Sequence, residues 1–264
     1  MAFAEVSHTC CVITGASRGF GRATAFALAD AFAASGCNSH FILLSRDEKN
    51  LQETKDGIMA LHSYAKVHTV VADLGEIKTL EETVKNALSK VEPNQVSHAI
   101  LLNNAASLGD ISSRIKEMTN LGAEFLQDYF NLNISSPMFL MSKFLKRFEG
   151  SNCTVINVSS LMAIESFSHL SLYCTGKAAR NMMCQVLAKE EPDVRVLNYA
   201  PGPLSTDMYD EICNTCGNQD LAAAFRKGQD ENKILSSSES ARKLVSLLKE
   251  DTFASGSHVD YYDF

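Results

Sequence analysis

The chain has 264 residues, 45% of them hydrophobic and 21% charged, a composition typical of a globular protein that can bury a sizeable core without disulfides or metals. The formal net charge of −7 argues against a nucleic-acid or anionic-membrane surface, because those surfaces need clustered basic residues. No stretch approaches the length of a membrane span, so we expect no membrane partner.

Short apolar segments alternate with longer amphipathic segments. The apolar segments are rich in Val, Ile and Leu, as strands covered on both faces should be, and we predict strands at Thr9–Thr14, His40–Ser45, Val67–Ala72, His98–Asn103, Thr154–Ser159 and Val194–Tyr199. Helices are predicted at Gly21–Ala34, Glu48–Tyr64, Ile77–Val91, Leu121–Phe148, Ser171–Glu190 and Ser238–Lys249. This order predicts an α/β fold, a single Rossmann-like doubly wound parallel sheet flanked by helices, in one domain over residues 1–264.

Two stretches near the C-terminal end depart from the alternation. The polar region Pro201–Leu235 is expected to be a long irregular insertion after a late strand. Insertions of that kind often cover a substrate site, so we predict a lid over residues 204–235. The tail Ser255–Asp260 is predicted to form one more strand.

The eight cysteines indicate a reducing compartment. Glu5 and His8 interrupt the N-terminal apolar residues, so we expect no secretory leader, reduced thiols and a cytoplasmic location. Cys213 and Cys216 have the spacing of half a zinc site, but no second Cys or His pair stands at usable spacing. No metal is therefore predicted.

A glycine-rich turn joins the first strand to the first helix. Glycines at this point allow a tight turn and a close approach of the backbone to a pyrophosphate, whose charge then faces the helix N-terminus. Because the turn lies between an apolar strand and an Ala-rich helix, it predicts a dinucleotide cradle rather than a turn without a ligand. The cradle residues are Gly15, Ala16, Ser17, Arg18, Gly19, Phe20 and Gly21.

The end of the second strand selects the cofactor. An enzyme that uses NAD typically has an acidic residue there to bind the ribose 2′-hydroxyl, whereas this chain has Ser45 and Arg46. The guanidinium groups of Arg46 and Arg18 suit a 2′-phosphate, because each planar fork donates two parallel hydrogen bonds. We therefore predict NADP (NADPH), with the reservation that Asp47 would weaken the discrimination if it pointed inward.

Three residues near the fifth predicted strand suit carbonyl reduction. Tyr173 and Lys177 are four residues apart on a predicted helix and share one face, and Ser160 follows the strand at the sheet edge where open α/β folds bind ligands. The reduced carbonyl oxygen needs a proton donor, and a nearby ammonium can lower the tyrosine pKa from its usual value of about 10. We therefore predict Tyr173 as the donor and Ser160 as the group that holds the carbonyl oxygen, and both Lys177 and the positive nicotinamide of the oxidised cofactor can supply the charge that lowers the tyrosine pKa.

Together these motifs resemble the short-chain dehydrogenase/reductase family over nearly the whole chain. The resemblance includes Asn103-Asn104-Ala105 and Pro201–Thr206, and it implies that Asn133 assists catalysis through a water that relays protons to the lysine. The cofactor contacts that it implies, beyond the cradle, Ser45 and Arg46, are Asp73, Leu74, Asn104, Tyr173, Lys177, Leu204, Ser205, Thr206, Asp207 and Met208. Ala106 stands where the family has glycine, which leaves the local loop geometry open.

Within the family, the chain is similar to the branch that reduces side-chain carbonyls of 6-substituted pterins, in the final steps of tetrahydrobiopterin synthesis. That branch is cytosolic, NADPH-dependent and homodimeric. The stretches that carry this likeness are Thr14–Arg22, Leu108–Asp110, Leu172–Arg180, Glu190–Met208 and the tail Ser255–Asp263.

The likeness also implies a substrate site. Its residues are Ser160, Leu161, Tyr173, Gly202 and Asp260. The branch often has a Trp three residues before the catalytic Tyr, where this chain has Leu170, so stacking on a pterin is expected either to be weaker or to be supplied by Phe167 or another ring. The homodimer would pack the helices Leu121–Phe148 and Ser171–Glu190 against their twofold mates.

Two other functions fit parts of the pattern. A broad-specificity carbonyl or diketone reductase would share every cofactor and catalytic residue and would differ in its use of Asp260. A non-catalytic NADP-sensing protein on the same fold is the second alternative, and the presence of both Tyr173 and Lys177 argues against it. The fold alone does not separate the three functions.

Overall fold

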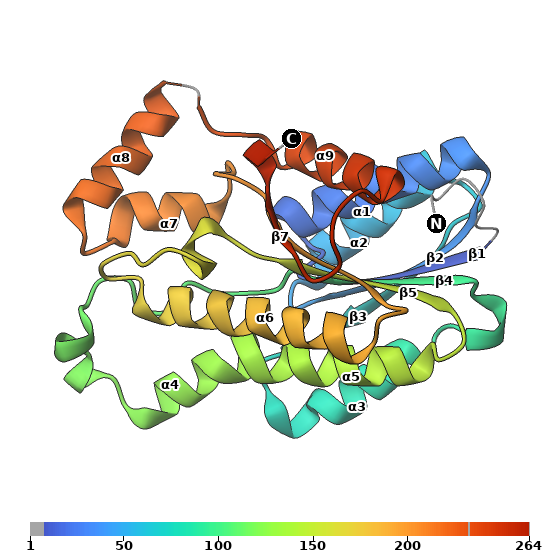
Figure 1. Ribbon diagram of the computed structural model, residues 1–264, viewed down its shortest axis with the longest axis horizontal. Coiled ribbons are helices and arrows are strands. Elements are labelled where there is room, and N and C mark those ends of the chain that lie inside the picture. Colours follow the sequence, from blue (N-terminus) through green and yellow to red (C-terminus); the bar gives the residue numbers. More distant parts are fainter. Residues whose placement is uncertain (1–7, 232, 264) are drawn as a thin grey trace.

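Seven parallel strands form one sheet in the order β3-β2-β1-β4-β5-β6-β7 (Figure 1). The computed structural model describes residues 8–231 and 233–263, so the leader prediction at Glu5 lies outside the described residues. The strands are β1 His8–Thr14, β2 Asn38–Ser45, β3 Lys66–Val71, β4 His98–Asn103, β5 Asn152–Val158, β6 Arg195–Ala200 and β7 His258–Asp260. The predicted doubly wound parallel sheet is therefore confirmed, with strand ends that differ from prediction by one or two residues along most of the chain.

Helices cover both faces of the sheet (Figure 1). Successive strand residues point to opposite faces, so Cys11 and Ile13 of β1 pack into one core, whereas Cys10 and Val12 pack into the other. The first core lies under α1 Gly19–Ser35, α2 Glu48–Leu61 and α9 Ser237–Glu250. The second lies under α3 Ile77–Leu88, α5 Ser136–Arg147 and α6 Ser171–Glu190.

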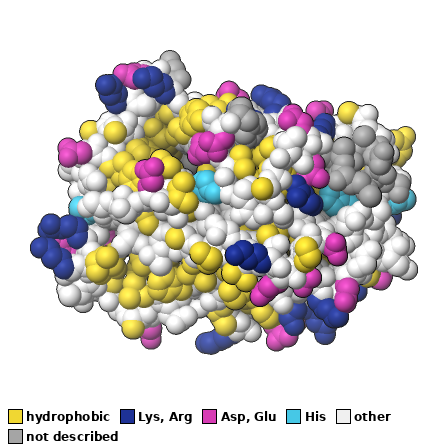
Figure 2. Space-filling model, in the orientation of Figure 1, with side chains coloured by type: hydrophobic (Ala, Val, Ile, Leu, Met, Phe, Trp, Pro, Cys, Tyr) yellow, Lys and Arg dark blue, Asp and Glu magenta, His cyan; other side chains and the backbone are white. Residues whose placement is uncertain are grey.

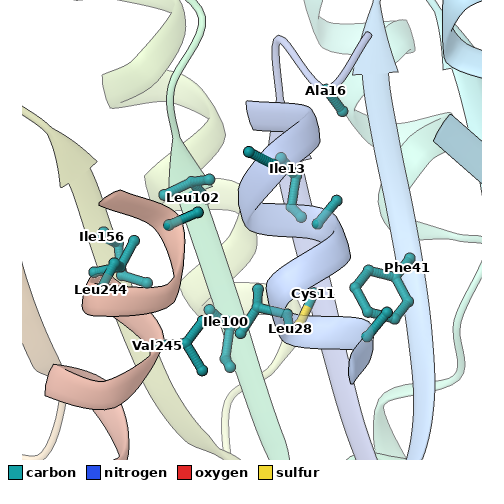
Figure 3. Packing of buried hydrophobic residues seen from close by; sticks show 14 of the residues in the cluster. Cys11, Ile13, Ala16, Leu28, Phe41, Ile100, Leu102, Ile156, Leu244 and Val245 are labelled. Atoms are coloured by element: carbon teal, nitrogen blue, oxygen red, sulfur yellow. The ribbon is translucent and has the colours of Figure 1, made fainter. Parts of the chain in front are cut away.

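In the first core, apolar side chains of two helices pack against the central strands of the sheet. Figure 3 shows Leu28 of α1 and Leu244 and Val245 of α9 against Ile100 and Ile156 of the central strands. All five side chains are buried. Burial of each of these side chains contributes about 1.5–3 kcal/mol to the stability of the folded state. This packing holds the central strands, whose ends carry the site, in fixed positions.

The long helix predicted from Leu121 to Phe148 is interrupted. It consists of α4 Ala123–Phe130, one wide π-helical turn over Asn131–Ser135, and α5. Pro137 explains the change of pitch, because proline has no N–H to donate to the preceding turn. The wide turn contains Asn133, whose side chain is buried.

The insertion before α9 is helical, so the predicted irregular structure is wrong. Residues 207–230 form α7 Asp207–Thr215 and α8 Gln219–Asp230. Each helix begins with a side-chain cap, since Thr206 accepts from Tyr209 N–H and Asn218 accepts from Leu221 N–H. These polar residues, which suggested a loop, are therefore helix starts. A parallel bridge between Leu204 and Leu235 joins the two ends of the segment.

The C-terminal strand is shorter than predicted. Its pairing with β6 covers only His258 to Asp260, because Gly256 has a φ of +82° and turns the chain before the strand begins. The register sets Asp260 beside Ala200, at the carboxyl end of the sheet. None of the helices in the described ranges has the length and apolar character needed to cross a bilayer.

Candidate active site

A cavity of about 760 Å³ opens at the carboxyl ends of the strands, where parallel α/β sheets bind ligands. Most of the residues selected from the sequence line it. These are Gly15, Ser17, Arg18, Gly19, Phe20, Ser45, Arg46, Asp73, Leu74, Asn104, Ser160, Leu161, Tyr173, Lys177, Gly202, Leu204, Ser205, Thr206, Asp207, Met208 and Asp260. Ala16 and Gly21 belong to the same turn and are buried behind its surface, and Asn133 is buried in the π turn.

The glycine turn has the geometry of a phosphate cradle. Gly15 has a φ of +65°, which favours glycine, and a Cβ on Gly21 would lie 2.3 Å from the Gly15 carbonyl oxygen. Asn104 Nδ2 donates to the carbonyl oxygens of Thr14 and Gly15, at 2.9 and 3.2 Å. The turn is therefore tied to the end of β4 and presents its backbone at the start of α1.

Both arginines proposed for the 2′-phosphate border the cavity and are paired with carboxylates. Arg18 forms an ion pair with Asp207 of α7, and Arg46 Nη1 lies 3.5 Å from Asp73 Oδ2. The four side chains are largely exposed, so these pairs stabilise the fold little and can exchange their partners. Ser45 Oγ donates to Ser17 Oγ at 2.7 Å, which links the second strand to the cradle.

Asp47 caps a helix and does not point into the cavity, where it would weaken the preference for NADP. Its carboxylate caps α2 by accepting from Asn50 N–H at 3.0 Å and from Asn50 Nδ2 at 2.5 Å. These hydrogen bonds lower the pKa of Asp47. The carboxylate is thus turned toward its own helix and is absent from the cavity lining.

The Ser160, Tyr173 and Lys177 side chains converge on one wall of the cavity. Ser160, Tyr173 and Lys177 all line the cavity, and Lys177 Nζ lies 5.5 Å from the centre of the Tyr173 ring. Lys177 Nζ also donates to the Val158 carbonyl oxygen at 2.6 Å, which fixes the amine against the end of β5. Both Tyr173 and Lys177 are buried.

Burial shifts the pKa values of both Tyr173 and Lys177 in this wall. Burial raises the pKa of Tyr173 to about 12, and the opposing influences are the Ser160 hydrogen bond and the charge of Arg180. Burial also lowers the pKa of Lys177, and repulsion from the charge of Arg180 is a second, smaller cause in the same direction. The role of Lys177 in lowering the pKa of Tyr173 stays a prediction.

Asn133 serves the loop that follows β4. Its Nδ2 donates to Tyr129 O at 2.9 Å and to Ser107 Oγ at 3.1 Å, and its Oδ1 accepts from Ser107 N–H at 3.0 Å. The Tyr129 hydroxyl in turn donates to Leu172 O at the start of α6. Asn133 thus ties the π turn to the loop beneath the catalytic helix.

Aromatic side chains and one carboxylate, from the C-terminal tail and from other segments, also line the cavity. Asp260 and Tyr262 of the tail border it, and Phe167, Tyr209 and Phe225 supply further rings. Leu170 is fully buried in the cluster below Tyr173, so it belongs to the core rather than to the cavity surface. Ala106 does not adopt a positive φ, and its methyl group lines the cavity without backbone strain.

Several lining residues gave no motif in the sequence. They are apolar, aromatic or small, and they reach the cavity because their segments fold over it: Leu44, Ala72, Leu132, Val158, Ser159, Met162, Tyr209, Ile212 and Phe225. The buried Arg180 was also missed. Its spacing was a usable signal, because it follows Lys177 by one helical turn on the same face of α6.

Comparisons with known proteins cover nearly the whole chain. The profile of the short chain dehydrogenase family matches residues 9–216. Sepiapterin reductase of Meriones unguiculatus is 41% identical over 96% of this chain and 96% of its own length, and that of Bos taurus is 39% identical over 98% and 96%. The crystal structure of the KRED1-Pglu enzyme superposes with a TM-score of 0.79 at 25% identity, over 95% of this chain and all of that chain.

Proposed function

The chain belongs to the short chain dehydrogenase family, so it is an oxidoreductase that uses a nicotinamide cofactor, and we propose that it reduces side-chain keto groups of 6-substituted pterins with NADPH. This is the reaction of a sepiapterin reductase, in the last steps of tetrahydrobiopterin synthesis. The glycine turn, Arg18 and Arg46 would hold the cofactor, which when bound would provide the hydride for the carbonyl carbon. Tyr173 gives its proton to the carbonyl oxygen, and Ser160 holds that oxygen by a hydrogen bond. Lys177 binds the cofactor and so fixes its position relative to Tyr173.

The observation that carries the pterin assignment is the position of Asp260. The strand β7 brings its carboxylate to the same cavity as Tyr173, and the Tyr262 backbone N–H donates to Asp260 Oδ1 at 3.0 Å. A pterin has a 2-amino group beside a ring N–H, two donors in one plane. A carboxylate accepts both in a short and directional fork. Phe167, which lines the cavity, offers an apolar face for the ring.

A side-by-side assay tests the proposed substrate class. With NADPH in excess, kcat/KM of the purified protein should be at least about 100-fold higher for sepiapterin than for a simple diketone, because the diketone lacks the paired donors. Equal values for the two substrates, or a preference for the diketone, would favour the broad carbonyl reductase instead.

The proposed NADP preference rests on Arg18 and Arg46. The double change Arg18→Ala, Arg46→Ala should raise the Kd of NADPH about 20-fold and leave that of NADH within about twofold, because only NADPH has the 2′-phosphate. Fluorescence titration of both cofactors measures this. Arg114, paired with Glu117 and outside the cavity lining, supplies the control Arg114→Ala. An equal loss for NADPH and NADH would contradict the assignment.

We also propose a homodimer through α4, α5 and α6. Exposed apolar side chains on these helices include Phe125, Met138, Met182 and Val186, with Met138 52% and Met182 59% exposed. Figure 2 shows a hydrophobic area on this side of the molecule. Such an area is typical of an isologous interface. Sedimentation at micromolar concentration should give twice the chain mass, and a monomer there would refute the dimer.

Two further assignments accompany the proposed function. A cytoplasmic location is supported by the cysteines, all eight of which are free thiols. A substrate lid over residues 204–235 is supported by Tyr209, Ile212 and Phe225, which line the cavity from α7 and α8. Residue 232 of that segment lies outside the described residues.

A further inference from the structure

The cavity wall formed by α7 and α8 contains a pair of aromatic side chains to which the reaction outlined above gives no role. Tyr209 of α7 and Phe225 of α8 both line the cavity. Figure 1 shows the two helices side by side at one end of the molecule. Rings in this wall matter because Leu170, at the position where related reductases often have Trp, is fully buried in the core and does not line the cavity.

The two rings are held in a defined arrangement. Their centroids lie 4.8 Å apart with an interplanar angle of 35°, within the range of favourable aromatic pairs. The Tyr209 hydroxyl donates to the Phe225 carbonyl oxygen at 2.7 Å. A Cβ on Gly228 would lie 3.0 Å from that hydroxyl, so the glycine leaves room for the hydrogen bond. Phe225 is therefore fixed by Tyr209 through both its ring and its backbone.

The helix that carries Phe225 is anchored beside the proposed proton donor. Ala222, three residues earlier on the same face of α8, is buried in the hydrophobic cluster that also contains Tyr173. Gly217, between α7 and α8, donates its backbone N–H to Ile111 O at 2.9 Å, which ties the helix pair to the loop after β4. Phe225 packs against the same cluster, so its ring belongs to the apolar surroundings of Tyr173.

A partly buried ring on a cavity wall is suited to bind a flat ring of a substrate. Phe225 is only partly covered by its neighbours, and the cavity adjoins it. Holding α7 and α8 together does not need this ring, because Arg226 Nη1 also donates to Cys213 O and Tyr209 bonds the Phe225 backbone. Two aromatic rings in contact gain more than the area that they bury, which an aliphatic side chain would not supply.

We propose that Phe225 is a specificity-determining residue that favours carbonyl substrates with a planar ring, and that Tyr209 is the residue that positions it. This inference rests on the proposed carbonyl reduction and is independent of the pterin assignment, because the ring face binds any planar ring. Tyr209 follows the predicted cofactor contact Met208, and its backbone N–H donates to Thr206 Oγ1 at 3.4 Å. The contact that positions Phe225 therefore starts at the segment that would border the cofactor.

The experiment compares diacetyl with the diketone in which phenyl replaces one of its methyl groups, at saturating NADPH. The unmodified protein should favour the phenyl compound in kcat/KM by at least about tenfold, because the ring enters an apolar wall. In Phe225→Leu this ratio should fall about fivefold, the usual contribution of one aromatic pair. The loss should appear in KM for the phenyl compound, with its kcat within about twofold, since the ring contacts no reacting atom.

The variant Tyr209→Phe tests the positioning role. It keeps the ring pair and removes the hydroxyl that bonds the Phe225 carbonyl oxygen. The ratio should fall about threefold, the effect of one ordinary hydrogen bond, again through KM for the phenyl compound. An unchanged ratio in Tyr209→Phe would show that Tyr209 does not position Phe225.

A matched control is Phe26→Leu. Phe26 is also a partly buried phenylalanine on a helix, α1, and it does not line the cavity, so the ratio should keep its value. Should Phe225→Leu fail to fold, Phe225→Met retains an apolar side chain of similar reach and should lower the ratio in the same direction.

The outcomes separate this inference from the proposed function. A folded Phe225→Leu or Phe225→Met protein with the ratio of the unmodified protein would overturn the proposal, and so would an equal loss for both diketones, which a purely structural ring pair would give. A ratio that falls as expected, in a protein that does not reduce sepiapterin, would support the role of Phe225 and reject the pterin assignment alone. Inactivity of the unmodified protein with all three carbonyl compounds would overturn the reductase assignment and this inference with it.

Discussion

The change Tyr173→Phe is expected to lower kcat about 1000-fold, within the range of general acid catalysis, while the Kd of NADPH stays within about twofold. The phenyl ring keeps the packing of the buried Tyr173 in the cluster below the cavity and loses only the hydroxyl. Stopped-flow measurement of a single turnover with sepiapterin or a diketone gives the rate of the chemical step. Fluorescence titration gives the cofactor affinity.

The variant Lys177→Met tests whether Lys177 contributes both to catalysis and to binding of the cofactor. Lys177 Nζ donates to Val158 O at the cavity edge, and in this family the lysine also holds the nicotinamide ribose, so both kcat and NADPH affinity should fall. A matched control is Lys189→Met, which changes a lysine near the other end of α6. If Tyr173→Phe turned over at a rate near that of the unmodified protein, Tyr173 would not be the proton donor.

The change Asp260→Asn should raise KM for sepiapterin about 50-fold, because hydrogen bonds to a charged group contribute about 1.5–3 kcal/mol and the amide presents donors to donors. NADPH affinity should be unchanged, since Asp260 lies on the tail strand rather than in the cradle. Reduction of a small diketone should also persist. Initial-rate kinetics with both substrates separate these effects.

The control for this variant is Asp210→Asn. Asp210 is an exposed carboxylate on α7 that does not line the cavity, so its loss changes the net charge equally. KM for sepiapterin should stay near the wild-type value in that protein. A wild-type KM in Asp260→Asn itself would show that the proposed pterin orientation is wrong, and the broad carbonyl reductase would then be the better assignment.

The sheet and its cofactor edge were predictable because local chemistry determines both. Short Val- and Ile-rich runs that alternate with helix-length segments are typical of parallel strands buried on both faces, and the prediction at His98–Asn103 matches β4 residue for residue. The glycines of the cradle have a direct steric reason, which Gly15 and Gly21 show. The likeness to the sepiapterin reductases extends over nearly the full chain, as the motifs and the tail indicated.

The errors have equally specific causes. Thr206 and Asn218 were interpreted as loop residues, although the same polarity makes them helix caps. The long helix was predicted without a break although Pro137 marks one, and the contacts that Asn133 makes within the wide turn have no local sequence signal.

The bridge between Leu204 and Leu235 has a consequence for engineering. Ser205 N–H donates to Leu235 O at 3.0 Å and Leu235 N–H donates to Pro203 O at 2.9 Å, so the two ends of the segment between them are held together independently of its length. The entropic cost of closing a loop grows slowly with its length. Thr206, Asp207 and Met208 are predicted cofactor contacts, so we expect the exchangeable part of the segment to be residues 209–234: grafting the corresponding residues of another reductase should alter the substrate chamber while the sheet, the cradle and the proton donor keep their places.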